Sequence, residues 1–285
     1  MRESSPAQRG TCAWTRVEIL GVAVDALRGE EAVDHLARLA ADPASGAVYV
    51  VKPYVEFLDR ARRDREVREL LAGAELSLAD GVALQWAAAY LAGPPRLNRL
   101  LGLLAAIVLR PAAIASVLPA RVAGATFTLP LLERAARDGL RVHLVGSPRS
   151  QTIEATAEHL RERIGGLRIT GVSEGRLDGT GEAALVTRLR EERPDLVLVG
   201  MGFPLQERLM ARLRTRLDHG VMLGEGGTFD YREFGGATRR APAAIRGLGL
   251  EWAWRLVLEP SRWRRQLAIP RFVWHVWRSS RRGHH

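Results

Sequence analysis

The chain has 285 residues, 47% of them hydrophobic, which is enough for one large α/β domain or two small ones. Its formal net charge is +10, and +9 of this lies between Arg239 and His285, where eleven arginines accompany two acids. This cationic segment predicts an anionic partner: a nucleic acid, a membrane surface or a phosphorylated substrate. Cys12 is the sole cysteine, which excludes an intrachain disulfide. Residues 1–16 are polar, lack the apolar run of a signal peptide and are expected to be disordered.

Short apolar runs alternate with amphipathic runs from residue 17 onward. The apolar runs predict buried strands, and the charged periodic runs predict helices. Their alternation predicts an α/β fold with a mainly parallel sheet and helices on both faces. The expected strands are 17–24, 47–51, 76–78, 141–145, 167–172, 196–200 and 221–224, and the expected helices are 30–41, 55–71, 82–91, 151–163, 182–193 and 207–217.

Residues 97–120 do not fit this alternation and look inserted. They hold two apolar runs separated by Arg110 and Pro111. Each run is shorter than the ~20 residues that span a bilayer, and the proline would break a single continuous helix. The segment predicts either a helical pair at a membrane interface or a buried insertion or oligomer contact.

The segment 250–282 carries five of the seven tryptophans, interleaved with arginine and aliphatic residues. Pro260 and Pro270 are expected to divide it into short helices. Tryptophan and arginine together suit a membrane–water interface. A nucleic-acid surface would also be rich in both, and a helical arm packed on the domain is a third interpretation. No feature of the predicted fold indicates nucleic-acid binding, so a membrane or a lipid substrate is the favoured partner of this segment.

Glycine-rich corners follow several expected strands, where parallel sheets bind ligands. In 200–207, the glycines allow close backbone approach, and Pro204 suits the start of a helix whose N–H groups attract an anion. The stretch 225–230 is a second corner or a simple turn, and Gly146-Ser147 is a weaker third. These corners predict a phosphate or nucleotide site.

Two further features carry candidate chemistry. Asp80 ends a short apolar strand, where it could act as a general base or cap the helix that follows. Arg255, Arg262 and Arg265 would share one helical face and could neutralise a diphosphate, or form a solvated basic face. No Asp-x-Asp pair, Walker loop or histidine spacing suggests a metal, so arginines and helix ends are expected to stabilise a leaving diphosphate.

Several motifs, taken in chain order, resemble the WecG/TagA/CpsF family of bacterial glycosyltransferases (glycosyltransferase family 26). The resemblance covers residues 17 to 272, nearly the whole chain. The motifs are Asp80-Gly81, Arg121-Val122-x-Gly124, Gly200-x-Gly-x-Pro-x-Gln206-Glu207, Gly226-Gly227-x-Phe229-Asp230, Arg240-Ala241-Pro242, Gly249-Leu250-Glu251-Trp252-x-x-Arg255 and Glu259-Pro260-x-Arg262.

The resemblance implies a Rossmann-like core over residues 17–249 and a membrane-associating appendage over residues 250–285. It implies inverting, metal-independent transfer of a sugar from a UDP-sugar to a polyprenyl-diphosphate-linked sugar, with N-acetylmannosamine transfer to undecaprenyl-diphosphate-GlcNAc as the best-known case. The protein would be peripheral at the cytoplasmic face of an anionic membrane, and a homo-oligomer is compatible with the sequence. A non-catalytic nucleotide- or lipid-binding homologue is the alternative.

By the same resemblance, Asp80 is the base that deprotonates the acceptor, and Arg255, Arg262 and Arg265 belong to the appendage that closes over the site. The residues expected to hold the nucleotide are Gly146, Ser147, Gly200, Gly202, Pro204, Gln206, Glu207, Gly226, Gly227 and Asp230.

The chain departs from the family pattern at three places. Family members usually have Thr-x-Asn-x-Glu where this chain has 52–56, and Gly-x-Asp where it has 124–126. A small apolar residue is usual at the position of Glu225. We expect these changes to lie near the substrate site, with Lys52, Tyr54 and Thr126 contacting the diphosphate or acceptor. Lys52, the only lysine, is expected to contact a carboxylate or phosphate of an unusual substrate, such as a uronic acid donor.

Overall fold

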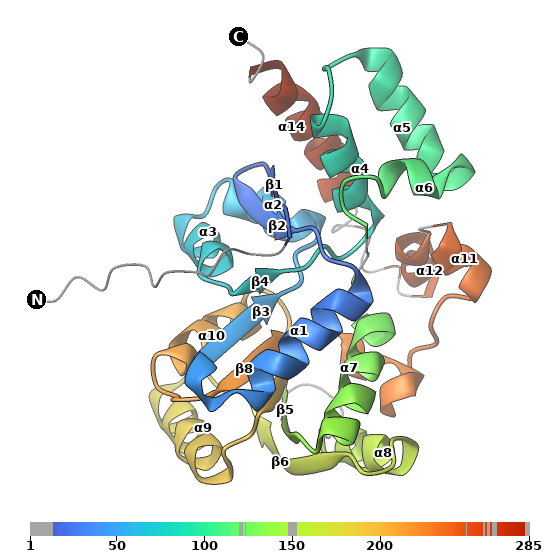
Figure 1. Ribbon diagram of the computed structural model, residues 1–285. Helices are drawn as coiled ribbons and strands as arrows, with labels where there is room; N and C mark the ends of the chain where they lie inside the picture. The colour runs from blue at the N-terminus through green and yellow to red at the C-terminus, as the bar shows by residue number, and fades with distance from the viewer. Residues whose placement is uncertain are drawn as a thin grey trace, which may run out of the picture.

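The protein is built around one six-stranded sheet, seen here in a computed structural model that describes residues 14–119, 122, 124–147, 153–248, 250–258, 260, 263 and 267–282. The strand order is β4-β3-β8-β7-β5-β6, and every neighbouring pair is parallel (Figure 1). This confirms the predicted Rossmann-like α/β fold. The strands are β3 (Ala47–Val51), β4 (Leu76–Ser77), β5 (Arg141–Gly146), β6 (Arg168–Glu174), β7 (Leu196–Gly200) and β8 (Gly220–Gly224).

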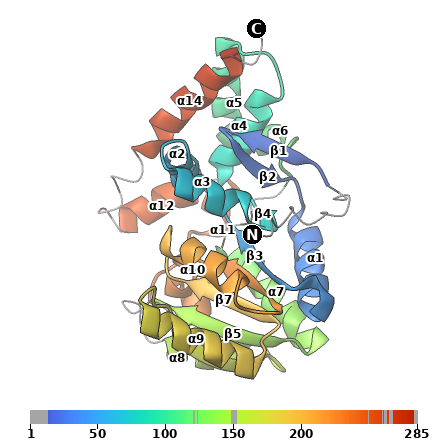
Figure 2. The same cartoon turned by 90° about the vertical axis from the view of Figure 1, so that its left-hand side faces the viewer.

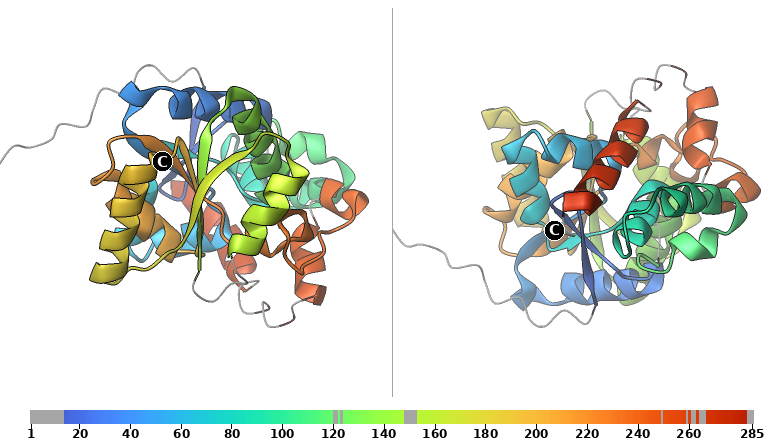
Figure 3. Two further views of the ribbon diagram at one scale, coloured as in Figure 1. Left: turned by 90° about the horizontal axis from the view of Figure 1, so that it is seen from below. Right: turned by 90° about the horizontal axis from the view of Figure 1, so that it is seen from above.

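Helices cover both faces of this sheet because alternate strand residues point to opposite sides. Val48 and Val50 pack in one buried cluster, while Tyr49 and Val51 pack in the other. Seen along the sheet, the two helical layers lie on either side of the strands (Figure 3, left). One layer contains α1 (Gly29–Ala41), α7 (Gly124–Asp138) and α8 (Ile153–Arg163); the other contains α2 (Val55–Ala61), α3 (Arg65–Ala72), α9 (Gly179–Glu192) and α10 (Leu205–Arg214).

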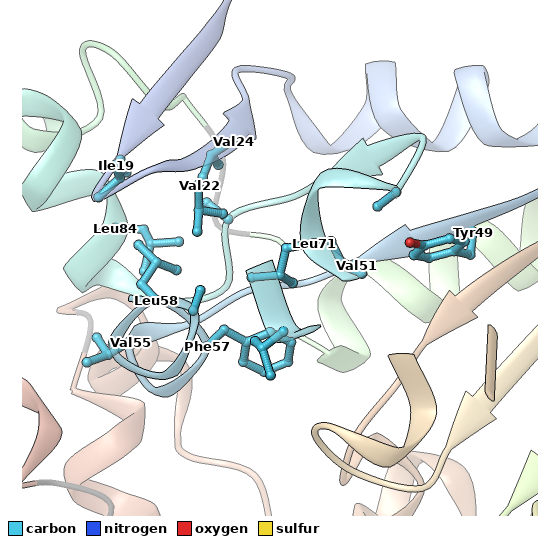
Figure 4. Packing of buried hydrophobic residues seen from close by; sticks show 14 of the residues in the cluster. Ile19, Val22, Val24, Tyr49, Val51, Val55, Phe57, Leu58, Leu71 and Leu84 are labelled. Carbon is cyan, nitrogen blue, oxygen red and sulfur yellow. The ribbon is translucent and has the colours of Figure 1, made fainter. Parts of the chain in front are cut away.

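A small lobe extends beyond the sheet on the β4 side. Its hairpin of β1 (Arg16–Ile19) and β2 (Val22–Asp25) packs with α4 (Val82–Leu91) and α2 (Figures 2 and 4). Asp25 is buried, pairs with Arg16 at 2.6 Å and accepts a 2.8 Å hydrogen bond from the Ser77 amide, which ties the hairpin to β4. Trp14 also donates to Asp25, so the end of the segment predicted to be disordered is bonded to the lobe; residues 1–13 lie outside the described part.

The C-terminal helix α14 (Ala268–Arg282) packs on α2 and α4, where Phe272 and Val276 are buried. The division into a core of 17–249 and an appendage of 250–285 stays a prediction. The remaining elements are α5 (Leu97–Leu109), α6 (Pro111–Ile114), α11 (Ala243–Gly247), α12 (Glu251–Leu258) and three short 3-10 turns, η1 (Pro43–Ser45), η2 (Thr228–Asp230) and η3 (Arg232–Phe234).

Four expectations about secondary structure were wrong or incomplete. The predicted strand 17–24 is a hairpin, because Leu20 and Gly21 both adopt positive φ, at 52° and 82°. The predicted helix 55–71 is two helices, because the Asp64 side chain caps α3. Pro270 lies in the first turn of α14 and does not divide it. Helix α7, with Pro130 inside it, was not predicted.

Residues 97–119 contain two helices, α5 and α6, which are separated at Arg110, as the helical-pair alternative predicted. Across the described residues, no helix combines the length and the apolar character that crossing a membrane would require.

Candidate active site

The ends of four neighbouring strands meet at one edge of the sheet. Asp80 follows β4, Lys52 follows β3, Glu225 follows β8 and Gly200 ends β7. Because these strands are parallel and adjacent, their carboxyl ends lie side by side. Backbone bonds join the loops: the Asp80 amide donates to Pro53 at 2.9 Å, and the Glu225 amide donates to Val199 at 2.7 Å. The residues expected to line one crevice therefore share one edge.

One buried amide joins the two main glycine corners. Oε1 of Gln206 accepts hydrogen bonds from the Gly202 amide at 3.2 Å and the Gly226 amide at 2.8 Å. Both glycines have positive φ, at 76° and 57°, and a Cβ atom on either would meet nothing within 4 Å. The corners therefore present open backbone that other residues could adopt only with strain.

Gly200 and Gly146 are required by packing. A Cβ atom on Gly200 would lie 2.5 Å from the Phe229 ring, and one on Gly146 would lie 2.9 Å from Ile153 of α8. A Cβ atom on Gly227 would lie 2.9 Å from Oδ2 of Asp230, which is exposed. Gly146 lies in register with Gly200, so the third corner, which continues into Ser147, shares the same edge.

The first turn of α10 lies against this edge of the sheet. Pro204 immediately precedes the helix, and its carbonyl accepts from the Arg208 amide at 3.1 Å. Gln206 donates from Nε2 to Oε1 of Glu207 at 2.9 Å. Glu207 is fully buried, its Oε2 has no hydrogen-bond partner among the described residues, and burial raises its pKa to about 7. Both side chains face inward and shape the corners.

A buried ion pair lies behind the corners. Nζ of Lys52 is 2.7 Å from Oε2 of Glu225, and the two side chains are 5% and 0% exposed. Oγ1 of Thr128, on α7, lies 2.8 Å from both carboxylate oxygens. In this structure the lysine reaches an internal carboxylate, where the sequence led us to expect a substrate group.

Asp80 has the electrostatic setting of a base. Burial is the main cause that raises its pKa to about 6; Lys52 and Arg255 oppose this rise, and Glu251 and Glu225 add to it. The alternative role as a helix cap is not realised, because Gly81, at φ 95°, occupies the cap position of α4. The carboxyl group therefore stays available at the edge of the sheet.

A cationic cluster around Tyr231 faces the same edge. The guanidinium carbons of Arg255 and Arg240 lie 4.7 Å and 5.9 Å from the centre of the Tyr231 ring. Glu251 links Tyr231 to Arg240, because its Oε1 is 3.4 Å from the tyrosine hydroxyl and 3.6 Å from Nε of Arg240. Burial, with smaller contributions from the nearby carboxylates, raises the pKa of Tyr231 to about 12 despite the two arginines. The phenol thus stays neutral.

Arg255 contributes hydrogen-bond donors that have no acceptor among the described residues. Its Nε and Nη2 atoms are shielded from solvent and have no hydrogen-bond partner within the described ranges. Shielded donors without an acceptor are costly, and an anion would satisfy them. Arg262 and Arg265, which were predicted to join this cluster, lie outside the described residues.

Tyr54 and Thr126 lie at the margins of the site. The Tyr54 hydroxyl donates to Glu56 at 2.9 Å, and its ring meets Phe57, which stacks on Phe203 at 3.9 Å. This aromatic row joins the end of β3 to the 200–207 corner. Thr126 is exposed on α7, where its hydroxyl lies 3.5 Å from Nη2 of Arg240.

Sequence reasoning missed four residues of the site: Thr128, Tyr231, Arg240 and Glu251. Arg240 and Glu251 stand inside the quoted motifs, which was the available signal. Thr128 and Tyr231 carry no local signal, because their roles arise only from tertiary contacts.

No group of three or more His, Cys, Asp or Glu side chains that could hold a metal ion occurs in the part of the chain that the structure describes. Metal-independent chemistry stays a prediction.

Comparisons with known proteins agree with the geometry. The sequence matches the family described as "Glycosyl transferase WecG/TagA/CpsF family" over residues 17–113 and 105–285. It is 30% identical over 249 residues to the N-acetylglucosaminyldiphosphoundecaprenol N-acetyl-beta-D-mannosaminyltransferase of Bacillus spizizenii strain W23, covering 87% of this chain and 86% of the relative. It is 28% identical over 242 residues to the protein of the same name from Bacillus subtilis strain 168, covering 85% and 83%. The chain therefore belongs to the WecG/TagA/CpsF family of glycosyltransferases.

Proposed function

We propose that this protein transfers a hexose, with inversion, from a UDP-sugar to a sugar linked to polyprenyl diphosphate, with Asp80 as the base. The observation that carries the proposal is the pairing of two features at one edge of the sheet. These are a carboxyl group with a pKa of about 6 and a neighbouring arginine whose shielded donors have no acceptor within the described part of the chain. The two Bacillus relatives are named for transfer to N-acetylglucosaminyldiphosphoundecaprenol, which supports this class of acceptor.

The step is a single displacement. The Asp80 carboxylate removes the proton of the acceptor hydroxyl, and that oxygen attacks the anomeric carbon of the donor. The bond from this carbon to the UDP oxygen breaks, and UDP leaves with the bonding pair. A pKa of about 6 suits this task, because the group is ionised at neutral pH and is more basic than an ordinary aspartate.

The leaving diphosphate carries negative charge, which Arg255 and Arg240 are placed to balance. A guanidinium fork matches phosphate oxygens, and Nε and Nη2 of Arg255 make no hydrogen bond to any described residue that an incoming phosphate would have to break. We expect Arg262 and Arg265 to add to this cluster. No metal is expected in the step.

The nucleotide would lie over the corners at Gly202 and Gly226. The open space beside both glycines lets a phosphate approach the backbone closely, and the N-terminus of α10 favours its negative charge. The Gly202 and Gly226 amides themselves donate to Gln206. Gln206 and Glu207 then act as positioning residues: their side chains are buried and hold the two corners together.

The protein would work as a peripheral protein at the cytoplasmic face of the membrane that carries its acceptor. The concentration of positive charge in 239–285 supports attraction to anionic lipid. Exposed Trp263 and Trp274, at 53% and 51%, suit headgroup depth.

A donor screen tests the proposal. The full chain is offered a panel of UDP-sugars with a short-chain, water-soluble diphosphate-linked GlcNAc acceptor, and UDP release and labelled product are measured. Acceptor-dependent UDP release with one donor is the expected result and would name the sugar. UDP binding with no turnover of any donor, also in native lipid extract, would instead identify a non-catalytic homologue.

A further inference from the structure

Helix α5 presents an apolar face to solvent. Leu97, Leu101, Val108 and Leu109 are 60%, 57%, 43% and 76% exposed, and Ala105 between them is also exposed. These positions fall on one side of a helix, and no charged residue interrupts the segment between Arg99 and Arg110. A continuous apolar face on a fixed surface helix indicates a contact that the isolated chain lacks.

The opposite face of α5 is firmly attached to the fold. Leu100 and Ala106 are buried, and the Arg99 guanidinium donates to the carbonyls of Tyr90 and Ala89, at the end of α4. Gln85 of α4 donates to the Leu118 carbonyl at 2.8 Å and so holds the far end of the insertion. The exposed leucines therefore cannot turn inward without breaking these contacts.

The charge around this face favours an anionic partner. The sequence contains no aspartate or glutamate from residue 81 to residue 132, and the exposed Arg96 and Arg110 bracket α5. Leucines flanked by arginines, without acids, match a bilayer surface with anionic headgroups. A surface that docks another protein would have no comparable reason to lack aspartate and glutamate.

Helix α14 lies at the same end of the molecule. Figures 1 and 2 show both helices at the end opposite α8 and α9, and the view from above shows them facing the viewer together (Figure 3, right). The exposed residues of α14 include Arg271, Trp274, Arg278 and Arg281. An aromatic-cationic helix and an apolar helix thus lie at the same end of the molecule (Figures 1 and 2), and both pack on α4.

We propose that α5 is a second membrane-contacting helix, which lies in the plane of an anionic bilayer with its Leu97–Leu109 face among the acyl chains. At 13 residues, α5 is about 20 Å long, which suits an interfacial helix and not a span. The idea rests on the lipid-linked acceptor of the proposed function, since membrane contact would hold the site near that acceptor.

The test is co-sedimentation of the full chain with phosphatidylcholine vesicles that contain or lack phosphatidylglycerol. We expect binding to the anionic vesicles, and a loss of about tenfold or more for Leu101→Asp/Leu109→Asp. The matched control, Ala184→Asp/Thr187→Asp on the exposed side of α9, carries the same charge change and should bind like the unaltered chain. Equal binding of the two variants would overturn the proposal.

A second experiment leaves the leucines of α5 unchanged, so its result does not depend on whether the aspartate variant folds. With Cys12 replaced by serine, Ala105→Cys carries an environment-sensitive dye, whose emission should shift to the blue on anionic vesicles. An unshifted spectrum with vesicle-bound protein would place α5 in water and refute the idea. If Leu101→Asp/Leu109→Asp instead dissociates a dimer in sedimentation velocity and leaves vesicle binding intact, the face joins two copies and the proposal is wrong.

Activity separates this inference from the proposed function. Leu101→Asp/Leu109→Asp should retain turnover of the water-soluble acceptor and lose turnover of an acceptor embedded in vesicles. Absence of turnover in every form would count against the proposed reaction, and the vesicle-binding comparison would still decide the role of α5.

Discussion

Nζ of Lys52 lies 2.7 Å from Oε2 of Glu225, and the two residues follow adjacent parallel strands, β3 and β8. Both side chains are almost entirely buried, and Thr128 adds a hydroxyl 2.8 Å from each carboxylate oxygen. The pair is buried at the edge of the sheet that carries the candidate site. Its charges lie beside Asp80, whose pKa Lys52 lowers and Glu225 raises.

Removing one partner should be far more harmful than removing both. Lys52→Met leaves a buried carboxylate unpaired and should lower the free energy of unfolding by about 3 kcal/mol. Lys52→Met/Glu225→Gln removes both charges and should recover most of this loss. Urea unfolding of the three proteins measures the difference. If the single and double variants are equally unstable, the pair does not contribute as argued.

The rate of transfer should depend on the ionisation of Asp80. Below pH 6 the carboxyl group holds a proton and cannot accept another, so kcat/KM should fall about tenfold per pH unit as the pH drops further. Asp80→Asn should lower kcat by about 100-fold or more while UDP affinity stays within about twofold. Glu207→Gln is the control, because it removes the other carboxyl with a raised pKa and should leave the limb near pH 6 in place. If the fall of kcat/KM below pH 6 shifts in Glu207→Gln, it reports the ionisation of Glu207 and not that of Asp80.

The same carboxyl group should weaken the fold as it ionises. Its folded pKa of about 6 lies above its ordinary value of 3.8, so its stabilising contribution is complete below pH 4 and is lost as the pH rises through 6. Asp80→Asn should therefore be more stable than the unaltered chain by about 1–2 kcal/mol at pH 7.5, and this gap should close towards pH 4. Glu207 titrates in both proteins and cancels in the comparison. A gap independent of pH would contradict the raised pKa.

Much of the fold follows from local sequence. Strand β3 and helix α4 coincide with their predicted ranges, because an apolar run between turn residues specifies a strand and Asp80-Gly81 marks the start of a helix. Once the strands are taken as parallel, the shared edge of Asp80 and the glycine corners follows from geometry alone.

The contacts that define the site were beyond local reasoning. Lys52 and Glu225 lie 173 positions apart, and only the order of the strands brings them together. The packing of α12 brings Glu251 to Tyr231 and Arg240, and the hydrophobic periodicity of the sequence does not predict this packing. Pro130 lies inside α7, and because proline usually interrupts a helix, the sequence pattern did not predict this helix, which carries Thr128.

Arg255 should be essential through the shape of its guanidinium and not only its charge. Arg255→Lys keeps a cation but loses the planar fork that binds two phosphate oxygens. We expect kcat/KM to fall by about 100-fold for Arg255→Lys and further for Arg255→Ala, with little change in the melting temperature. Arg163→Ala, an exposed arginine at the end of α8, is the control and should behave as the unaltered chain. Full activity of Arg255→Lys would show that a point charge is enough.

Gln206 should act on the nucleotide site without touching the nucleotide. Gln206→Leu removes the acceptor of the Gly202 and Gly226 amides, and we expect a loss of about 2 kcal/mol in stability and a weaker affinity for UDP. Isothermal titration with UDP and urea unfolding measure the two effects. Weaker UDP binding at full stability would mean that Gln206 contacts the ligand directly.

Gln206→Glu offers a sharper form of the same test, because it keeps the acceptor oxygens but places a second carboxyl group beside that of Glu207. The pKa of Glu207 is about 7, so below that pH the buried pair can share a proton and the clamp should survive. Above pH 7 both groups would ionise and repel each other without a compensating cation. Gln206→Glu should therefore approach the stability of the unaltered chain at pH 5.5 and fall below it steadily towards pH 8.5. A constant difference across this range would mean that the two side chains do not interact in the folded protein.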